Sequence, residues 1–77
     1  MGSVKVSPVL KDIASELPAV CTTADLEKLL KIDASSWATW RYEGKGPEFL
    51  KLGGAVRYTR QAVLAWLSQQ VTGGDVV

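Results

Sequence analysis

The stretch TTADLEKLLKIDASSWATWRYEGKGPEFLKLGGAVRYT, residues 22–59, decides the fold of this chain. Thr22 is followed three residues later by Asp25, and this spacing predicts a capping box at the start of a helix over residues 23–31. The next two residues predict a tight turn, in which Asp33 is the N-cap of a second helix. Two short helices joined by a sharp turn predict a helix-turn-helix unit.

The second helix, which starts at Ala34 and is ended by Gly44, has two faces of different character. Trp37 and Trp40 are spaced as neighbours on a helix surface and are predicted to anchor the core, together with Trp66 further along the chain. The opposite side carries small or polar residues, namely Ser35, Ser36, Thr39 and Tyr42. Such a side lets a groove of a partner molecule come close, so these residues are candidate contacts.

The segment FLKLGGAVRY, residues 49–58, predicts a β-hairpin in which apolar and basic residues alternate along both strands. Pairing Leu52 with Val56 places the apolar residues on one face and Lys51 with Arg57 on the other, and it leaves a three-residue loop, so we expect this register. A two-residue Gly-Gly turn would pair Lys51 with Val56 and mix the faces. Glycine permits either turn.

Two further helices flank this stretch. Residues 1–6 show no pattern and are expected to be loose, whereas residues 7–18 predict an extra N-terminal helix that is capped by Ser7 and has one apolar stripe. We expect this helix to fold back onto the domain, with self-association as the alternative. After the hairpin, Thr59 predicts the start of a last helix that extends to about Gln70. The N-terminal stripe consists of Leu10, Ile13, Ala14 and Leu17.

The predicted architecture is therefore a single winged helix-turn-helix domain over residues 19–71, mostly α with a small β-hairpin, followed by a loose tail over residues 72–77. A chain of 77 residues allows one domain. The single cysteine, Cys21, excludes an intramolecular disulfide and is predicted to be a small buried hydrophobe. No apolar run approaches the ~18 residues of a membrane span, and the N-terminus lacks a secretory signal, so we expect a cytoplasmic protein.

Charge is distributed unevenly along the chain, although the net charge is only +1. The segment from Arg41 to Arg60 holds five basic and two acidic residues, a net charge of +3, whereas the remaining residues hold four basic and six acidic ones, a net charge of −2. Positive charge is thus concentrated on the end of the second helix and on the hairpin, as expected for a surface that meets a DNA backbone. The candidate phosphate contacts are Arg41, Lys45, Lys51 and Arg57.

Several kinds of active site are excluded by residues that the chain lacks. It has no histidine, the commonest general base and metal ligand, and one cysteine cannot build a zinc site of the usual kind. Its glycines make neither the dinucleotide-binding pattern nor the Walker pattern. We therefore expect a protein that is not an enzyme and that uses no cofactor and no metal.

Four segments resemble a known family. They are TTADLEKLL (22–30), SWATWRYEGKGP (36–47), FLKLGGAVRYTR (49–60) and VLAWL (63–67). Together they resemble the small MerR-like winged helix-turn-helix proteins of the phage excisionase and prophage-regulator type, and the most specific part is the tryptophan-to-proline segment followed by the hairpin. The resemblance implies double-stranded DNA as the partner, with the second helix in the major groove and the hairpin, or wing, near the backbone or minor groove.

The family includes proteins with two roles. Excisionases bind repeated sites cooperatively, bend DNA and help an integrase to carry out excision, whereas their relatives are small transcriptional regulators. The resemblance therefore implies an integrase as a further partner and self-association on DNA. We favour the excisionase role because the chain is small and shows no effector domain, with the regulator as the alternative. In another class, a protein-interaction module without DNA binding would use the N-terminal stripe and the hairpin edge.

The chain departs from the family pattern at three places. Lys31 stands where the tight turn usually has glycine, which costs about 1 kcal/mol if the position needs a positive φ. The start of the second helix, Ala34-Ser35-Ser36, lacks the usual basic residues, and Thr39 replaces a common arginine. Bidentate reading of guanine, worth roughly 1–3 kcal/mol per contact, is therefore less available. We expect specificity to rest on hydroxyl and methyl contacts, on water and on DNA shape.

Overall fold

The computed structural model describes residues 8–70 as four helices and one three-stranded antiparallel sheet. The sheet has the order β1-β3-β2, and the predicted mostly α fold with a small hairpin is confirmed. The expectations for residues 1–6, for the Ser7 cap and for residues 72–77 lie outside the described residues. The elements are α1 (Pro8–Glu16), β1 (Val20–Cys21), α2 (Thr23–Leu30), α3 (Ala34–Glu43), β2 (Leu50–Leu52), β3 (Ala55–Thr59) and α4 (Arg60–Gln70).

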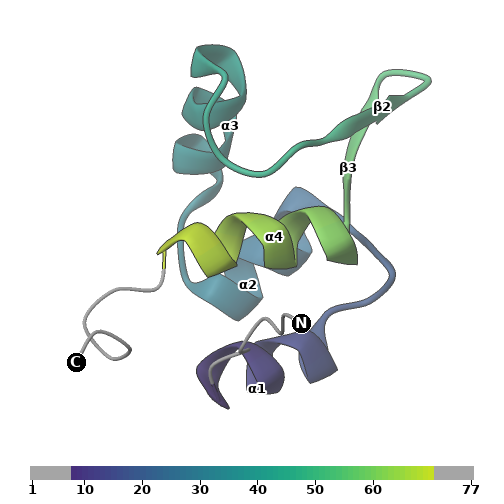
Figure 1. The fold of residues 1–77 in the computed structure, drawn as a ribbon. Helices are drawn as coiled ribbons and strands as arrows, with labels where there is room; N and C mark the ends of the chain where they lie inside the picture. Colours follow the sequence, from purple (N-terminus) through teal and green to yellow (C-terminus); the bar gives the residue numbers. More distant parts are fainter. Residues whose placement is uncertain (1–7, 71–77) are drawn as a thin grey trace.

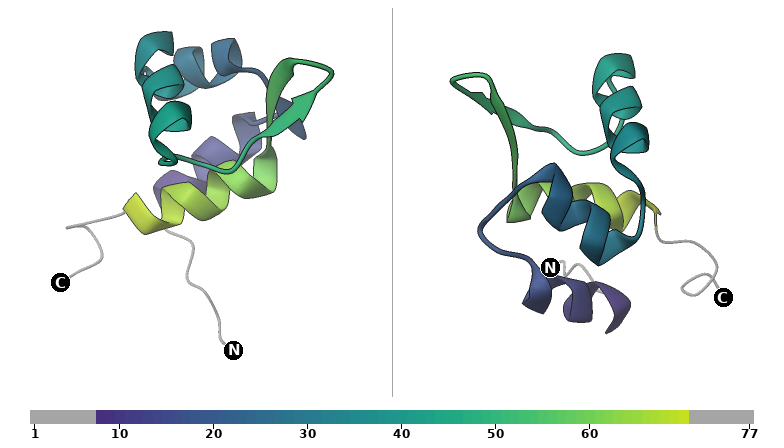
Figure 2. Two further views of the ribbon diagram at one scale, coloured as in Figure 1. Left: turned by 90° about the horizontal axis from the view of Figure 1, so that it is seen from above. Right: turned by 180° about the vertical axis from the view of Figure 1, so that it is seen from behind.

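The elements lie in three levels (Figure 1). α2 and α4 form the middle level, α1 lies below them, and α3 and the β2–β3 hairpin project from the opposite side. The view from behind in Figure 2 shows the same order. Leu17, just after α1, is buried in the core cluster, and Ile13 packs against that cluster. The N-terminal helix thus folds back onto the body, while α3 and the hairpin stay uncovered by it.

Local capping sets both ends of α2. The predicted capping box is present, because the Thr22 hydroxyl accepts a hydrogen bond from the Asp25 backbone N–H at 3.0 Å and the Asp25 carboxylate accepts one from the Thr22 N–H at 2.9 Å. At the other end, Lys31 adopts a φ of 61° in the left-handed region, so the helix ends one residue earlier than predicted. The turn therefore places a lysine at a positive φ, a conformation that glycine adopts at lower cost.

An aromatic cluster fixes α3 on the body. Trp37 is fully buried, and its indole N–H donates to the Ile32 carbonyl at 3.0 Å. The rings of Trp40, Tyr58 and Trp66 surround it with centroid distances of 5.2, 5.9 and 5.8 Å. Aromatic pairs at such distances contribute about 0.5–1.5 kcal/mol each beyond the area they bury. The tryptophans of α3 thus face the interior and leave the other side of the helix to solvent.

The hairpin register differs from the prediction. Leu52 pairs with Ala55 and Lys51 pairs with Val56, so the loop is the two-residue turn Gly53-Gly54. The predicted pairing of Leu52 with Val56 is therefore wrong. The φ values of 60° and 95° at the two glycines suit a type I′ turn, whose twist matches that of the strands. Because the hairpin tip projects beyond the core, no buried face selects the apolar sorting, and the turn geometry decides.

The left-handed Lys31 generates a stability prediction. Lys31→Gly should raise the free energy of unfolding by about 0.5–1 kcal/mol, because glycine adopts positive φ without the cost of a Cβ. Chemical denaturation of both proteins measures the change. The matched control is Lys28→Gly, an exposed position inside α2, which should lower stability by about 1 kcal/mol. If both variants changed the free energy of unfolding in the same direction, the backbone strain assigned to Lys31 would be contradicted.

The hairpin turn generates a second prediction. Gly54→Val should disrupt the register at the tip, because a β-branched residue is strained at a φ of 95°, although the space around the Cβ position is open. Gly53→Asn should keep the register, because asparagine tolerates left-handed φ. Cross-strand nuclear Overhauser effects between Lys51 and Val56 should persist in the second variant and be lost in the first. Their persistence in Gly54→Val would show that the turn does not set the register.

Candidate nucleic-acid interface

The side of α3 that faces away from the tryptophans is open to solvent. Thr39 is exposed, and Tyr42 is 92% exposed although it is a large aromatic residue. The exposure of Thr39 and Tyr42 follows from the burial of Trp37. With Trp37 facing the core, side chains two and five positions further along the helix point outward. Thr39 and Tyr42 therefore lie on the solvent-exposed surface of α3.

The two serines at the start of α3 are hydrogen-bonded to Asp33. The Ser35 and Ser36 hydroxyls donate to its carboxylate oxygens at 3.0 and 2.8 Å, and the Asp33 side chain makes no cap to the backbone. These donations, from Ser36 first and then Ser35, lower the pKa of Asp33 below its ordinary value of 3.8. A carboxylate therefore stands beside the serines, where it repels phosphate and can accept a bond from the amino group of cytosine.

The sequence interpretation missed this role of Asp33, which it treated only as a helix cap. The signal that could have revealed it is the spacing of Asp33 from the two serines, since short hydroxyl side chains bond to nearby acceptors at helix starts. The predicted contribution of Ser35 and Ser36 also changes. Their hydroxyl hydrogens are engaged within the protein, so only their oxygens remain available to accept a hydrogen bond from a partner.

Arg41 is oriented by two hydroxyl groups of the protein. Its Nη1 donates to the Tyr58 hydroxyl at 2.7 Å and to the Thr23 hydroxyl at 3.3 Å. The guanidinium is therefore directed towards the base of the hairpin and the start of α2. Among the four residues predicted to contact phosphate, Arg41 is the one whose side chain is hydrogen-bonded to other helices or strands, namely α2 and β3.

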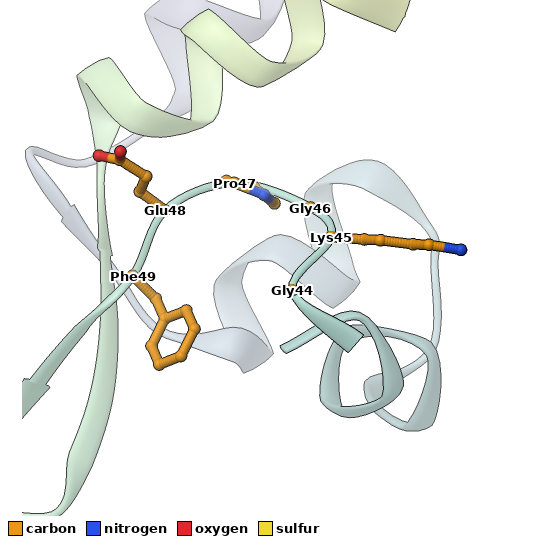
Figure 3. Close-up of a pocket in the computed structure, with 6 residues that line it drawn as sticks. All are labelled: Gly44, Lys45, Gly46, Pro47, Glu48 and Phe49. Carbon is orange, nitrogen blue, oxygen red and sulfur yellow. The ribbon is translucent and has the colours of Figure 1, made fainter. Parts of the chain in front are cut away.

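Lys45 lies on the linker between α3 and β2. Its ammonium is 3.6 Å from the Glu43 carboxylate, and the Lys45 and Glu43 side chains are 70% and 45% exposed. An ion pair of this kind contributes about 0–1 kcal/mol, so the lysine can exchange its partner at little cost. Figure 3 shows the Lys45 side chain extending away from the linker, which borders an open hollow of about 330 Å³.

The close fit of this linker depends on Gly46. It has a φ of 79°, and a Cβ placed there would lie 3.3 Å from the Cβ of Trp40. The backbone can therefore pass close to Trp40 before it enters the hairpin. Figure 3 shows Glu48 and Phe49 pointing to opposite sides of the linker, and the Phe49 ring lies 6.3 Å from that of Tyr58.

The basic residues of the hairpin lie on opposite faces of the ribbon. In the observed register Arg57 shares a face with Leu50, whereas Lys51 shares one with Val56, so the prediction of a common basic face is wrong. Lys51 is exposed, and Arg57 is half-buried with its Nη1 donating to the Val56 carbonyl at 2.8 Å. The face that carries Arg57, which we call the outer face, also has three exposed apolar side chains. They are Val20, Leu50 and Leu52, which are 50%, 44% and 56% exposed.

Other chemistry is scarce in the described part of the chain. Residues 8–70 contain no group of three metal-ligating side chains, and no helix among them has the length and apolar character needed to cross a membrane. Cys21 is buried, and burial raises the pKa of its thiol above the ordinary value, as does the nearby Asp25 charge. The thiol therefore stays protonated and unreactive at neutral pH.

The serine contacts of Asp33 generate a pH prediction. Ser36→Ala should raise the pKa of Asp33 towards its ordinary value, as measured by carbon NMR titration of the carboxyl group. Because the folded-state pKa is lowered, the serine contacts stabilise the fold above the unfolded-state pKa, and this stabilisation is lost as pH falls through the folded-state pKa. The variant should weaken that pH dependence. Ser68→Ala, which removes a hydroxyl bonded only to Ala65, should change neither quantity.

Comparison with known proteins agrees with this geometry. A family model described as helix-turn-helix domain matches residues 20–71, from β1 to just beyond α4. No curated protein and no solved structure gave a match. The matched region contains both helices of the turn, the linker and the hairpin, and it leaves α1 outside. The family is a DNA-binding one that is typically not enzymatic, and it supports sequence-specific binding to double-stranded DNA. The chain belongs to this helix-turn-helix family.

Proposed function

We propose that the protein binds double-stranded DNA with α3 in the major groove and the hairpin against the adjacent backbone or minor groove. The observation that carries this proposal is that α3 and the hairpin project from the same side of the body (Figures 1 and 2), while Thr39 and Tyr42 of α3 are exposed. An α-helix fits the major groove, and a narrow two-stranded ribbon can lie beside it.

Residue roles follow from this docking. Thr39 and Tyr42 meet base edges or the thymine methyl group, and the serine oxygens accept from amino groups near Asp33. Lys45, Lys51 and Arg57 contact phosphates, with the two hairpin residues reaching backbone on either side of the ribbon. Direct readout is limited because α3 presents no exposed arginine. Specificity therefore comes in large part from DNA shape and ordered water.

The biological role that we propose is that of a phage or prophage excisionase. The resemblance of the tryptophan-to-proline segment and hairpin supports this role, which includes repeated sites, DNA bending, cooperative self-association and an integrase partner. Transcriptional regulation by the same fold is the alternative within DNA binding.

A different class of function is favoured by one observation, the exposed outer face formed by Val20, Leu50 and Leu52. A protein-interaction module would dock a partner on this face. Salt distinguishes the two classes, because DNA binding through several phosphates weakens steeply as salt rises, whereas apolar docking does not. A salt titration of the affinity for mixed-sequence DNA should show the steep decrease.

The phosphate contacts generate a mutational prediction. Lys51→Ala should weaken binding to all DNA sequences alike and reduce the slope of log K against log salt by about one, as expected for one lost phosphate contact. The control is Lys11→Ala, an exposed lysine on α1 on the other side of the molecule, which should leave both quantities unchanged. Gel-shift titrations at several salt concentrations measure both. An unchanged slope for Lys51→Ala would remove the hairpin from the interface.

The base contacts generate a separate prediction. Thr39→Val removes the hydroxyl and keeps a methyl group, whereas Thr39→Ser does the reverse. One of the two should lose discrimination at a single base pair by about 1–3 kcal/mol while the salt slope stays constant. Binding selections from randomised DNA locate that base pair. If both variants keep the full site preference, Thr39 does not read a base.

The role is tested by footprinting on DNA that flanks the protein's own gene, with and without a neighbouring integrase. Repeated protected sites within an attachment region, together with integrase-dependent excision, are expected. A single protected operator at a promoter would instead favour the transcriptional regulator.

A further inference from the structure

Arg41 makes the long-range side-chain hydrogen bonds of the described structure. Its bonds to Tyr58 and Thr23 span 17 and 18 residues, whereas every other side-chain hydrogen bond between described residues joins positions at most five apart. One guanidinium nitrogen therefore connects three elements, because Arg41 is on α3, Tyr58 is on β3 and Thr23 opens α2.

The partner at the hairpin is buried and packed in the core. Tyr58 is 1% exposed, pairs with Cys21 in the sheet and packs its ring 5.9 Å from that of Trp37. Its hydroxyl oxygen is thus held in place by the core, at the point where the hairpin leaves the body. The Arg41 guanidinium donates to this oxygen, so the hydrogen bond sets the direction of α3 relative to β3.

The guanidinium is held by neutral groups. Within residues 8–70, no carboxylate lies within 4.0 Å of Arg41. Hydrogen bonds from a charged donor are stronger than those between neutral groups, so the 2.7 Å contact with Tyr58 is a firm one. Turning the guanidinium outward to a phosphate would break it.

We propose that Arg41 is a positioning residue, which locks the angle between α3 and the hairpin, rather than a phosphate contact. The proposal rests on the function proposed above, since that angle matters when the two elements enter adjacent grooves together. With the angle fixed, binding of one element places the other. Without a fixed angle, α3 and the hairpin each lose orientational entropy separately when they bind DNA.

Charge-conserving variants separate the two roles. Tyr58→Phe and Arg41→Lys leave the net charge unchanged, and a lysine cannot reproduce the fixed fork of the guanidinium. Positioning predicts that each weakens DNA binding about five- to tenfold with an unchanged salt slope. The combined variant should bind no more weakly than the weaker single variant, within about twofold, because both changes remove the same contact. Thr23→Val should show a smaller loss in the same direction.

A phosphate contact predicts the opposite set of results. Arg41→Lys would then bind almost as the parent does, Tyr58→Phe would have no effect, and Arg41→Ala would lower the salt slope by about one. Any of these results would overturn the positioning role. Binding should be measured well below the unfolding midpoint of each variant, and Thr23→Val provides the test should Tyr58→Phe not fold.

A measurement without DNA keeps the inference distinct from the proposed function. In the parent protein, residual dipolar couplings of α3 and β3 amides should fit a single alignment frame. In Tyr58→Phe the two elements should require different frames. If the parent bound no DNA, the proposed function would fail while this measurement still tested the link. Unchanged couplings in Tyr58→Phe would refute the link itself.

Discussion

Burial of the Trp37 indole is the constraint on which the rest of the structure depends. Its full burial, with its N–H bonded to the Ile32 carbonyl, fixes both the rotation of α3 about its axis and the position of its first turn. Successive residues of a helix are rotated by a constant angle, so this one side chain determines that Thr39 and Tyr42 face solvent. The same ring touches Tyr58, which ties the foot of the hairpin to the helix. Core packing and the exposed surface are consequently two results of one interaction.

Features governed by neighbouring residues could be predicted from the sequence. The Thr22 capping box and the inward tryptophans depend on spacings within one or two helical turns, and both are found. The left-handed φ of Lys31 was not predicted in this way, because the residue pattern placed Lys31 inside the helix and a positive φ entered only through the family resemblance. The register of the hairpin could not be predicted from its alternating pattern. Alternation selects a register only where one face is buried, and here Leu50 and Leu52 remain exposed. At the tip, the preference of a Gly-Gly pair for a type I′ turn is the stronger local influence.

In the candidate site, too, features set by nearby residues could be predicted and a contact between residues distant in the sequence could not. The exposed side of α3 follows from helical periodicity, and the bonds from Ser35 and Ser36 to Asp33 lie within three residues, so they were open to prediction. The bond between Arg41 and Tyr58 was not, because nothing in the spacing of residues so far apart indicates that they meet. Sequence reasoning therefore grouped Arg41 with the exposed basic residues, whereas its guanidinium joins elements of the fold.

Modest charge makes fixed geometry more important in the proposed binding mode. The chain has a net charge of +1, and the start of α3 carries an aspartate rather than a basic residue, so phosphate attraction alone provides little discrimination. Readout of DNA shape depends on how much a sequence must deform to fit a given protein surface. A surface whose two projections could move independently would adapt to many sequences and lose that discrimination. A surface whose projections are held at one angle makes the DNA deform instead, and so turns a weakly charged interface into a selective one.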